Sequence, residues 1–170
     1  MSSKPLSYFL LFLLFSLITT LSLAQPSAAP ESATATCTFD DGKEVNVRYI
    51  PVAAAKEKLP NGKIWAPGGT PMMLFTQADL LIANATLPVG AYSLYAIPGK
   101  SEWTLVVNKD VTAGAKYDEK DDLARASMDT GQVSQSLPTL DVAFAHTGPK
   151  QCTLRMYVGK IGAWADFKEK

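Results

Sequence analysis

Residues 87–99 read LPVGAYSLYAIPG, and residues 101–109 continue as SEWTLVVNK. Apolar side chains fill both faces of each segment at the two-residue period of an extended chain, as expected for strands that lie within a protein core. Pro98 and Gly99 stand between the segments, and this pair is typical of a type II turn, in which the glycine adopts a positive φ. The two segments therefore predict a β-hairpin near the centre of the chain.

Further short segments with the same period of two lie on both sides of this hairpin. They are separated by Gly, Pro, Asn and Asp, and they cover residues 34–39, 43–50, 72–76, 79–85, 139–146 and 151–158. A short helix is predicted over VAAAKEK after Pro51, and a crossover helix or a turn over EKDDLARASM at residues 119–128. The sequence predicts an all-β fold, an antiparallel β-sandwich that is Greek-key or immunoglobulin-like, with one or two short helices.

The first predicted hairpin has a register that its turn can fix. A three-residue loop ending at Gly42 pairs Phe39 with Lys43 and Cys37 with Val45. This register places the apolar side chains of both strands on one side, whereas a two-residue loop would divide them between two faces. We therefore expect the three-residue loop, with Gly42 in the left-handed conformation.

Four segments in the middle of the chain resemble a known family. They are KIWAPGG (63–69), LPVGAYSLYAIPG (87–99), SEWTLVVNK (101–109) and YDEKDDLAR (117–125), and their succession is similar to the bacterial family called domain of unknown function 2911. The resemblance covers roughly residues 45–158 and implies an exported β-protein, with no established activity to carry over. The chain has Trp65-Ala66-Pro67-Gly68-Gly69-Thr70 where the family pattern has Trp-Arg-x-Gly-Ala-Asn.

The N-terminal segment has the pattern of a secretory signal. Lys4 is followed by PLSYFLLFLLFSLITTLSLA at residues 5–24, which ends in a small-x-small sequence. We predict a signal peptide at 1–24, a flexible segment rich in Pro, Ala, Ser and Thr at 25–35, and a single β-sandwich domain at 36–170. The alternative is an uncleaved membrane anchor, because the apolar run is nearly long enough to cross a bilayer. After cleavage no membrane association is expected, and the location is periplasmic or extracellular.

Cys37 and Cys152 are the two cysteines of the chain, and they lie near the two ends of the expected domain. In an oxidising compartment such a pair predicts a structural disulfide, since the spacing is neither a redox Cys-x-x-Cys nor a zinc site. Two buried free thiols are the alternative. Alternation places Cys152 on the apolar face of the last strand with Leu154, Met156 and Val158, as a disulfide partner of Cys37 would be.

Composition excludes several classes of function. The chain has 16 basic and 16 acidic residues, and this balance argues against a nucleic-acid partner. It carries no phosphate loop, dinucleotide fingerprint or zinc spacing, so no cofactor and no metal are predicted. His146 is the sole histidine, and no Gly-x-Ser-x-Gly segment accompanies it, so we assign no catalytic residue.

Four residues are candidates for a ligand site. Trp65 stands before a Pro-Gly-Gly loop, where we expect a partly exposed aromatic ring, and Gly68 and Gly69 would let a ligand approach the backbone closely. Tyr95 lies on the opposite face of its strand from Tyr92. Space-filling between the sheets is the alternative for these aromatic residues.

These observations favour an exported, non-enzymatic β-protein that binds an unknown ligand or protein partner. Two alternatives stay open. One is a hydrolase that uses a pair of carboxylates on loops at one end of the fold, and the other is a structural accessory of an envelope assembly.

Overall fold

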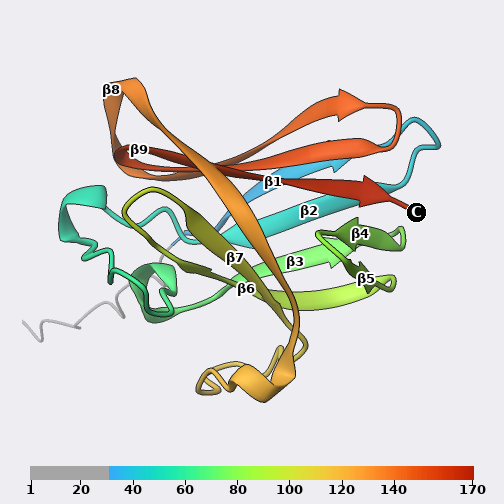
Figure 1. The fold of residues 1–170 in the computed structure, drawn as a ribbon, viewed down its shortest axis with the longest axis horizontal. Coiled ribbons are helices and arrows are strands. Elements are labelled where there is room, and N and C mark those ends of the chain that lie inside the picture. The colour runs from blue at the N-terminus through green and yellow to red at the C-terminus, as the bar shows by residue number, and fades with distance from the viewer. Residues whose placement is uncertain (1–30) are drawn as a thin grey trace, which may run out of the picture.

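Antiparallel strands make up most of the computed structural model, which describes residues 31–170 (Figure 1). The strands are β1 Ala33–Thr38, β2 Glu44–Tyr49, β3 Met72–Thr76, β4 Leu80–Ile82, β5 Ala85–Leu87, β6 Gly90–Ile97, β7 Trp103–Asn108, β8 Asp122–Gly148 and β9 Gln151–Glu169. Single turns of 3₁₀ helix lie at η1 Ala54–Lys56, η2 Pro67–Gly69 and η3 Glu119–Asp121. The predicted signal peptide at 1–24 lies outside the described residues, and β1 begins at Ala33, inside the segment predicted at 25–35. Within residues 31–170 no helix is long and apolar enough to cross a membrane.

The strands form one open sheet with the order β1-β2-β3-β6-β7-β8-β9-β4-β5. Every pairing between these strands is antiparallel. The all-β, antiparallel class is therefore confirmed. The short hairpin of β4 and β5 does not lie between β3 and β6 in the sheet. It pairs instead with the end of β9, where Leu80 lies opposite Glu169.

Strands β8 and β9 are long, and each bends back on itself partway along its length (Figure 1). The pairing of β8 with β9 shifts register between Gln132 and Leu137, where β8 turns. β9 turns near Gly159, which has φ 60°, so that its two halves lie side by side. The N–H of Glu169, at the end of β9, accordingly donates to the carbonyl of Lys150, which immediately precedes β9. The outer face of this doubled ribbon carries the candidate site described below.

The predicted β1–β2 register is confirmed. Cys37 pairs with Val45, the Phe39 N–H donates to the Lys43 carbonyl at 2.9 Å, and Gly42 has φ 87°. The positive φ at Gly42 is the reason for the three-residue loop, because an L side chain there would be strained.

One hydrophobic core lies beneath the sheet, and the predicted disulfide crosses it. Cys37 in β1 and Cys152 in β9 are bonded, and both are buried. Leu154, Met156 and Val158 share the buried face of β9 with Cys152, as expected. The disulfide therefore joins the first strand of the sheet order to a strand near its other end.

The helix predicted after Pro51 is wrong, and of the segment 119–128, predicted as a crossover helix or a turn, only residues 119–121 form a turn, η3. Residues 52–58 contain only the turn η1, because the Val52 carbonyl accepts from the Leu140 N–H and Ala53 bridges to Thr139. Residues 122–128 are strand, since they pair with β7 and bury alternate side chains. In both places pairing with another strand prevails over local helix propensity.

Two turn predictions also differ from the structure. β6 and β7 form the predicted hairpin, but Gly99 does not have the positive φ of a type II turn. Glycine is needed there because a Cβ would lie 2.1 Å from the Glu102 carbonyl oxygen. The segment 79–85, predicted as one strand, is divided between β4 and β5 by a turn at Ala83, which has φ 50°.

Candidate functional site

Trp65 is buried, which corrects the expectation of a partly exposed ring. Only 4% of its surface is exposed, and its ring packs edge-on against Trp103 with 5.8 Å between ring centroids. Its indole N–H donates to Glu57 Oε2 at 2.8 Å, and its backbone pairs with Ala96. Because the carboxylate satisfies the N–H, the whole indole can be buried without losing a hydrogen bond.

Gly68 and Gly69 form the turn that follows Trp65. Both have positive φ values, and the Gly68 N–H donates to the second oxygen of Glu57 at 3.2 Å. A Cβ at Gly68 would lie 2.6 Å from Cγ1 of Val52. The glycine thus serves the close packing of its own turn. Binding of a ligand at either glycine stays a prediction.

Tyr95 is also buried, but on the face of β6 that is turned away from the core cluster. Its ring packs against Tyr117 with 5.0 Å between centroids, so the loop between β7 and β8 covers it. Trp65 belongs to the core cluster and Tyr95 does not. The structure therefore does not bring the predicted aromatic residues together in one site.

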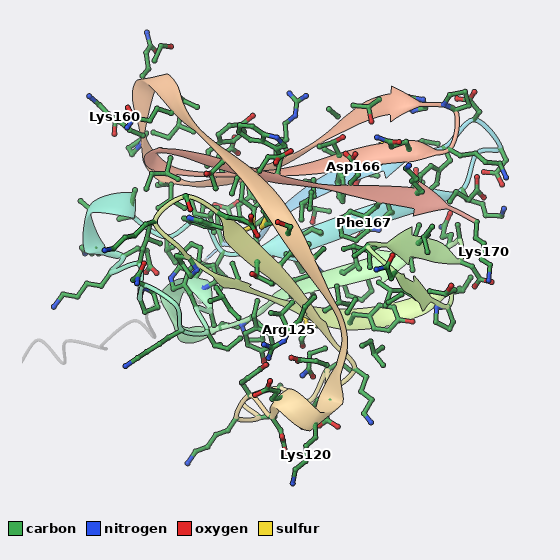
Figure 2. All side chains as sticks on the ribbon, in the orientation of Figure 1. Lys120, Arg125, Lys160, Asp166, Phe167 and Lys170 are labelled. Atoms are coloured by element: carbon green, nitrogen blue, oxygen red, sulfur yellow. A yellow bond between two sulfur atoms is a disulfide. The ribbon has the colours of Figure 1, made fainter. Side chains whose placement is uncertain are left out.

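The loop that covers Tyr95 is held by a polar cluster at the start of β8. The Tyr117 hydroxyl donates to Asp122 at 2.7 Å, and Arg125 donates to both residues at 2.8 Å. Burial, followed by the hydrogen bond to Asp122, raises the pKa of Tyr117 to about 12. Figure 2 shows Arg125 low on β8, above the loop that carries Lys120. The hydrogen-bonding groups of this cluster are engaged with one another, which indicates a role in fixing the loop.

His146 lies at the end of β8, as its place beside a turn predicts. Its Nδ1 contacts the Thr38 carbonyl at 2.9 Å, and its Nε2 lies 3.4 Å from Asp40. Residues 31–170 contain no group of three or more His, Cys, Asp or Glu side chains arranged to hold a metal ion.

A pocket that contains none of these residues lies on the outer face of β8 and β9. Its volume is about 600 Å³, within the ~300–1,000 Å³ typical of small-molecule sites. We call it the outer-face pocket. Its lining consists of Ala83, Ala126, Ser127, Asp129, Thr147, Gln151, Thr153, Arg155, Trp164, Ala165 and Asp166.

Trp164 is the aromatic residue of the outer-face pocket, and two glycines make room for its ring. Gly131 in β8 pairs with Gly162 in β9. Two residues further along the same strands, on the same face of the sheet, Asp129 pairs with Trp164. A Cβ at Gly131 would lie 2.8 Å from Cη2 of Trp164, and one at Gly162 would lie 3.3 Å from its Cζ3. The benzo end of the indole therefore lies where side chains at these two positions would otherwise stand. Trp164 is half-buried, whereas Trp65 and Trp103 are buried.

Polar side chains surround this ring, and one group of them is already ordered. The carboxylate of Asp166 accepts from the Thr153 hydroxyl at 2.6 Å and from the Gln151 amide at 2.9 Å. Figure 2 shows Asp166 beside Phe167 on the last stretch of β9. Alternation along the strand sends Phe167 into the core and Asp166 to the outer face.

Asp129 and Arg155 are the other charged groups of the pocket. Neither makes an ion pair or a side-chain hydrogen bond with any residue in the described range 31–170, and they are not paired with each other. A carboxylate that can accept and a guanidinium that can donate thus flank the same aromatic ring. This arrangement can bind a ligand that has a flat apolar face and polar edges.

The sequence predictions did not include Trp164, although a signal for it exists. In the segment GAWADFKE, Ala163, Ala165 and Phe167 alternate with Trp164 and Asp166. A tryptophan in phase with an aspartate and out of phase with a phenylalanine is expected on the polar face of a strand.

Comparison with known proteins gives one match. The family model described as Protein of unknown function (DUF2911) matches residues 30–165, which include Trp164 and most of the pocket lining. No curated protein and no solved structure matches the chain at a significant level. Because the model covers most of the chain, this protein belongs to the DUF2911 family.

Proposed function

We propose that this protein is exported and that it binds a ligand in the outer-face pocket without catalysing a reaction. The observation that carries the proposal is the half-buried Trp164 ring, which lies in a 600 Å³ cavity between the unpaired charged groups of Asp129 and Arg155. Ligand pockets typically combine an apolar surface with a few polar groups that fix orientation. The outer-face pocket has both.

Export is supported by two features. The apolar segment at 5–24 has the pattern of a cleaved signal, and the Cys37–Cys152 disulfide suits an oxidising compartment, either the periplasm or the cell exterior. Mass spectrometry of the protein recovered from outside the cytoplasm should give a chain that begins at Gln25. A chain retaining residues 1–24 would favour the membrane anchor instead.

We further propose that the folded sheet acts as a sandwich-like scaffold for the pocket. Side chains from β1, β2, β8 and β9 join one core cluster, which supports packing of the two arms of the sheet against each other. The rigid doubled ribbon of β8 and β9 then fixes the pocket on its outer side.

A carboxylate-based hydrolase is the second candidate, because Asp129 and Asp166 both line the pocket. Two carboxylates on either side of a bound glycosidic bond are the usual requirement for glycoside hydrolysis. Binding is the stronger proposal, because the Asp166 carboxylate already accepts hydrogen bonds from Thr153 and Gln151. If the protein cleaved a bound ligand and Asp129→Asn abolished the release of product, hydrolysis would become the stronger proposal.

A thermal-shift screen tests the binding proposal. The purified protein is melted with divalent metals, saccharides, small acids and lipids, each with the native chain and with Trp164→Ala. A ligand at about a hundred times its Kd stabilises the folded state by roughly 2.7 kcal/mol, so the Tm should rise visibly for the native chain.

The same rise should be absent in Trp164→Ala and retained in Lys168→Ala. Lys168 is the matched control, because it lies on the same outer face of β9 but outside the pocket. A ligand that stabilises both variants equally binds elsewhere. A screen without any shift would contradict the proposal and favour a protein partner or a structural role in an envelope assembly.

A further inference from the structure

We propose that the ligand of the outer-face pocket is a neutral saccharide, whose ring stacks on Trp164 and whose hydroxyl groups bond to Asp129 and Arg155. This inference rests on the proposed function and names its ligand class.

We infer that the indole serves as a flat platform. The facing glycines Gly131 and Gly162 let the benzo end of the ring lie close to the backbone, because a Cβ at Gly131 would lie 2.8 Å from Cη2 and one at Gly162 would lie 3.3 Å from Cζ3. The ring of Tyr157 also borders Gly162, because a Cβ there would lie 3.2 Å from its Cδ1. Trp164 is half-buried and lines the cavity, so we infer that the C–H face of a pyranose ring stacks on its exposed part.

The edge of this platform has groups of both hydrogen-bonding kinds. Asp129 faces Trp164 directly across the two strands and can accept from adjacent hydroxyl groups. Arg155 can donate to the ring or hydroxyl oxygens of the same sugar. Since each sugar hydroxyl both donates and accepts, a saccharide satisfies this mixed lining better than a ligand of one polarity.

Charge favours a neutral ligand over an anion. Two carboxylates line the pocket, from Asp129 and Asp166, against the single guanidinium of Arg155. An acidic ligand would bring a third negative charge into the same cavity. A uronic acid is therefore expected to bind more weakly than the neutral sugar of the same ring shape.

NMR of the three indole N–H groups provides the test. The Trp164 signal is assigned by its absence in Trp164→Phe, while Trp65 and Trp103 serve as internal controls because their rings are buried. The titrated probes are glucose, galactose, mannose, N-acetylglucosamine and their β1,4-linked disaccharides. We expect at least one to shift the Trp164 signal and to leave the other two unchanged.

Variants then test the geometry. Trp164→Ala should weaken the binding sugar about tenfold or more. Asp129→Asn should weaken it several-fold, and Lys168→Ala should leave it unchanged. Gly131→Ala keeps the indole but forces it off the sheet, because the new Cβ would lie 2.8 Å from Cη2, so it should also weaken binding while the protein stays folded. Equal affinity for the native chain and for Gly131→Ala would contradict the platform.

Flat probes without sugar hydroxyl groups separate the two proposals. If no saccharide shifts the Trp164 signal but adenine or indole-3-acetate does, the saccharide class is wrong and the pocket is retained. If neither saccharides nor flat aromatic probes shift it, both proposals fail. Tighter binding of galacturonate than of galactose would overturn the argument from charge.

Discussion

Gly68 and Gly69 adopt similar backbone conformations, with φ of 63° and 80°, but their surroundings differ. A Cβ at Gly68 would meet Val52 at 2.6 Å, whereas a Cβ at Gly69 would have no atom within 4 Å. Both alanine substitutions impose the strain of a positive φ, which is about 1–2 kcal/mol. Only Gly68→Ala adds a steric clash.

We therefore expect Gly68→Ala to lower the free energy of unfolding by roughly 1–3 kcal/mol more than Gly69→Ala. Chemical denaturation of both variants alongside the native chain measures the difference. Equal losses would show that Val52 can move away, and that the packing of this turn is loose.

The loop between β7 and β8 shows how one element depends on a few contacts. Tyr117 packs on Tyr95 and donates to Asp122, and its pKa is raised to about 12 from an ordinary value of 10.0. The folded chain thus keeps the phenol proton at a pH where the unfolded chain loses it. This contribution to stability is complete below pH 10 and is lost as the pH rises through about 12.

As the pH rises from 10 to about 12, the free energy of unfolding of Tyr117→Phe should consequently fall less than that of the native chain. Denaturation midpoints of both proteins across the range provide the measurement. Tyr49, Tyr92 and Tyr95 also have raised pKa values, but they are present in both proteins and cancel in the comparison. Parallel curves for the two proteins would contradict the assignment.

At the scale of elements, local rules predicted some features and missed others. The β1–β2 register was predictable, because Gly42 and the two-residue period both act within ten residues. Residues 122–128 were not, since their acidic start and alanines suit a helix and only pairing with β7 makes them a strand. The alternation of Ala124, Ala126 and Met128 was the competing signal.

The candidate site was harder to predict than the elements. Trp65 and Tyr95 are in segments that resemble the family, but both are buried. Glu57 accepts the hydrogen bond of the Trp65 indole N–H, and the ring of Tyr117 covers Tyr95.

The face of β9 on which Trp164 lies was predictable, but the contact of its ring with Gly131 and Gly162 was not. The two glycines come from two strands whose register shifts elsewhere along the ribbon, and no local pattern specifies such a pairing.

Over the whole molecule, the disulfide closes a loop of 115 residues between Cys37 and Cys152. In the chain-entropy model such a loop stabilises the folded state by roughly 4–5 kcal/mol. We expect Cys37→Ala/Cys152→Ala to lose most of this amount on chemical denaturation. Native protein reduced under the same conditions should approach the double variant, and denatured native protein that has not been reduced should contain no free thiol. An unchanged midpoint after reduction would assign the stability of the folded sheet to its core alone.

The position of this bond also decides how the molecule responds to mechanical force. A load applied between the two ends passes from β1 directly into β9 through the sulfur atoms, and it bypasses everything between Cys37 and Cys152. That segment, up to roughly 400 Å of extended chain, is shielded from stretching until the bond is reduced. The boundary of the shielded loop runs through the outer-face pocket: Asp129 and Thr147 lie inside the loop, whereas Thr153, Arg155, Trp164, Ala165 and Asp166 lie on the segment that bears the load.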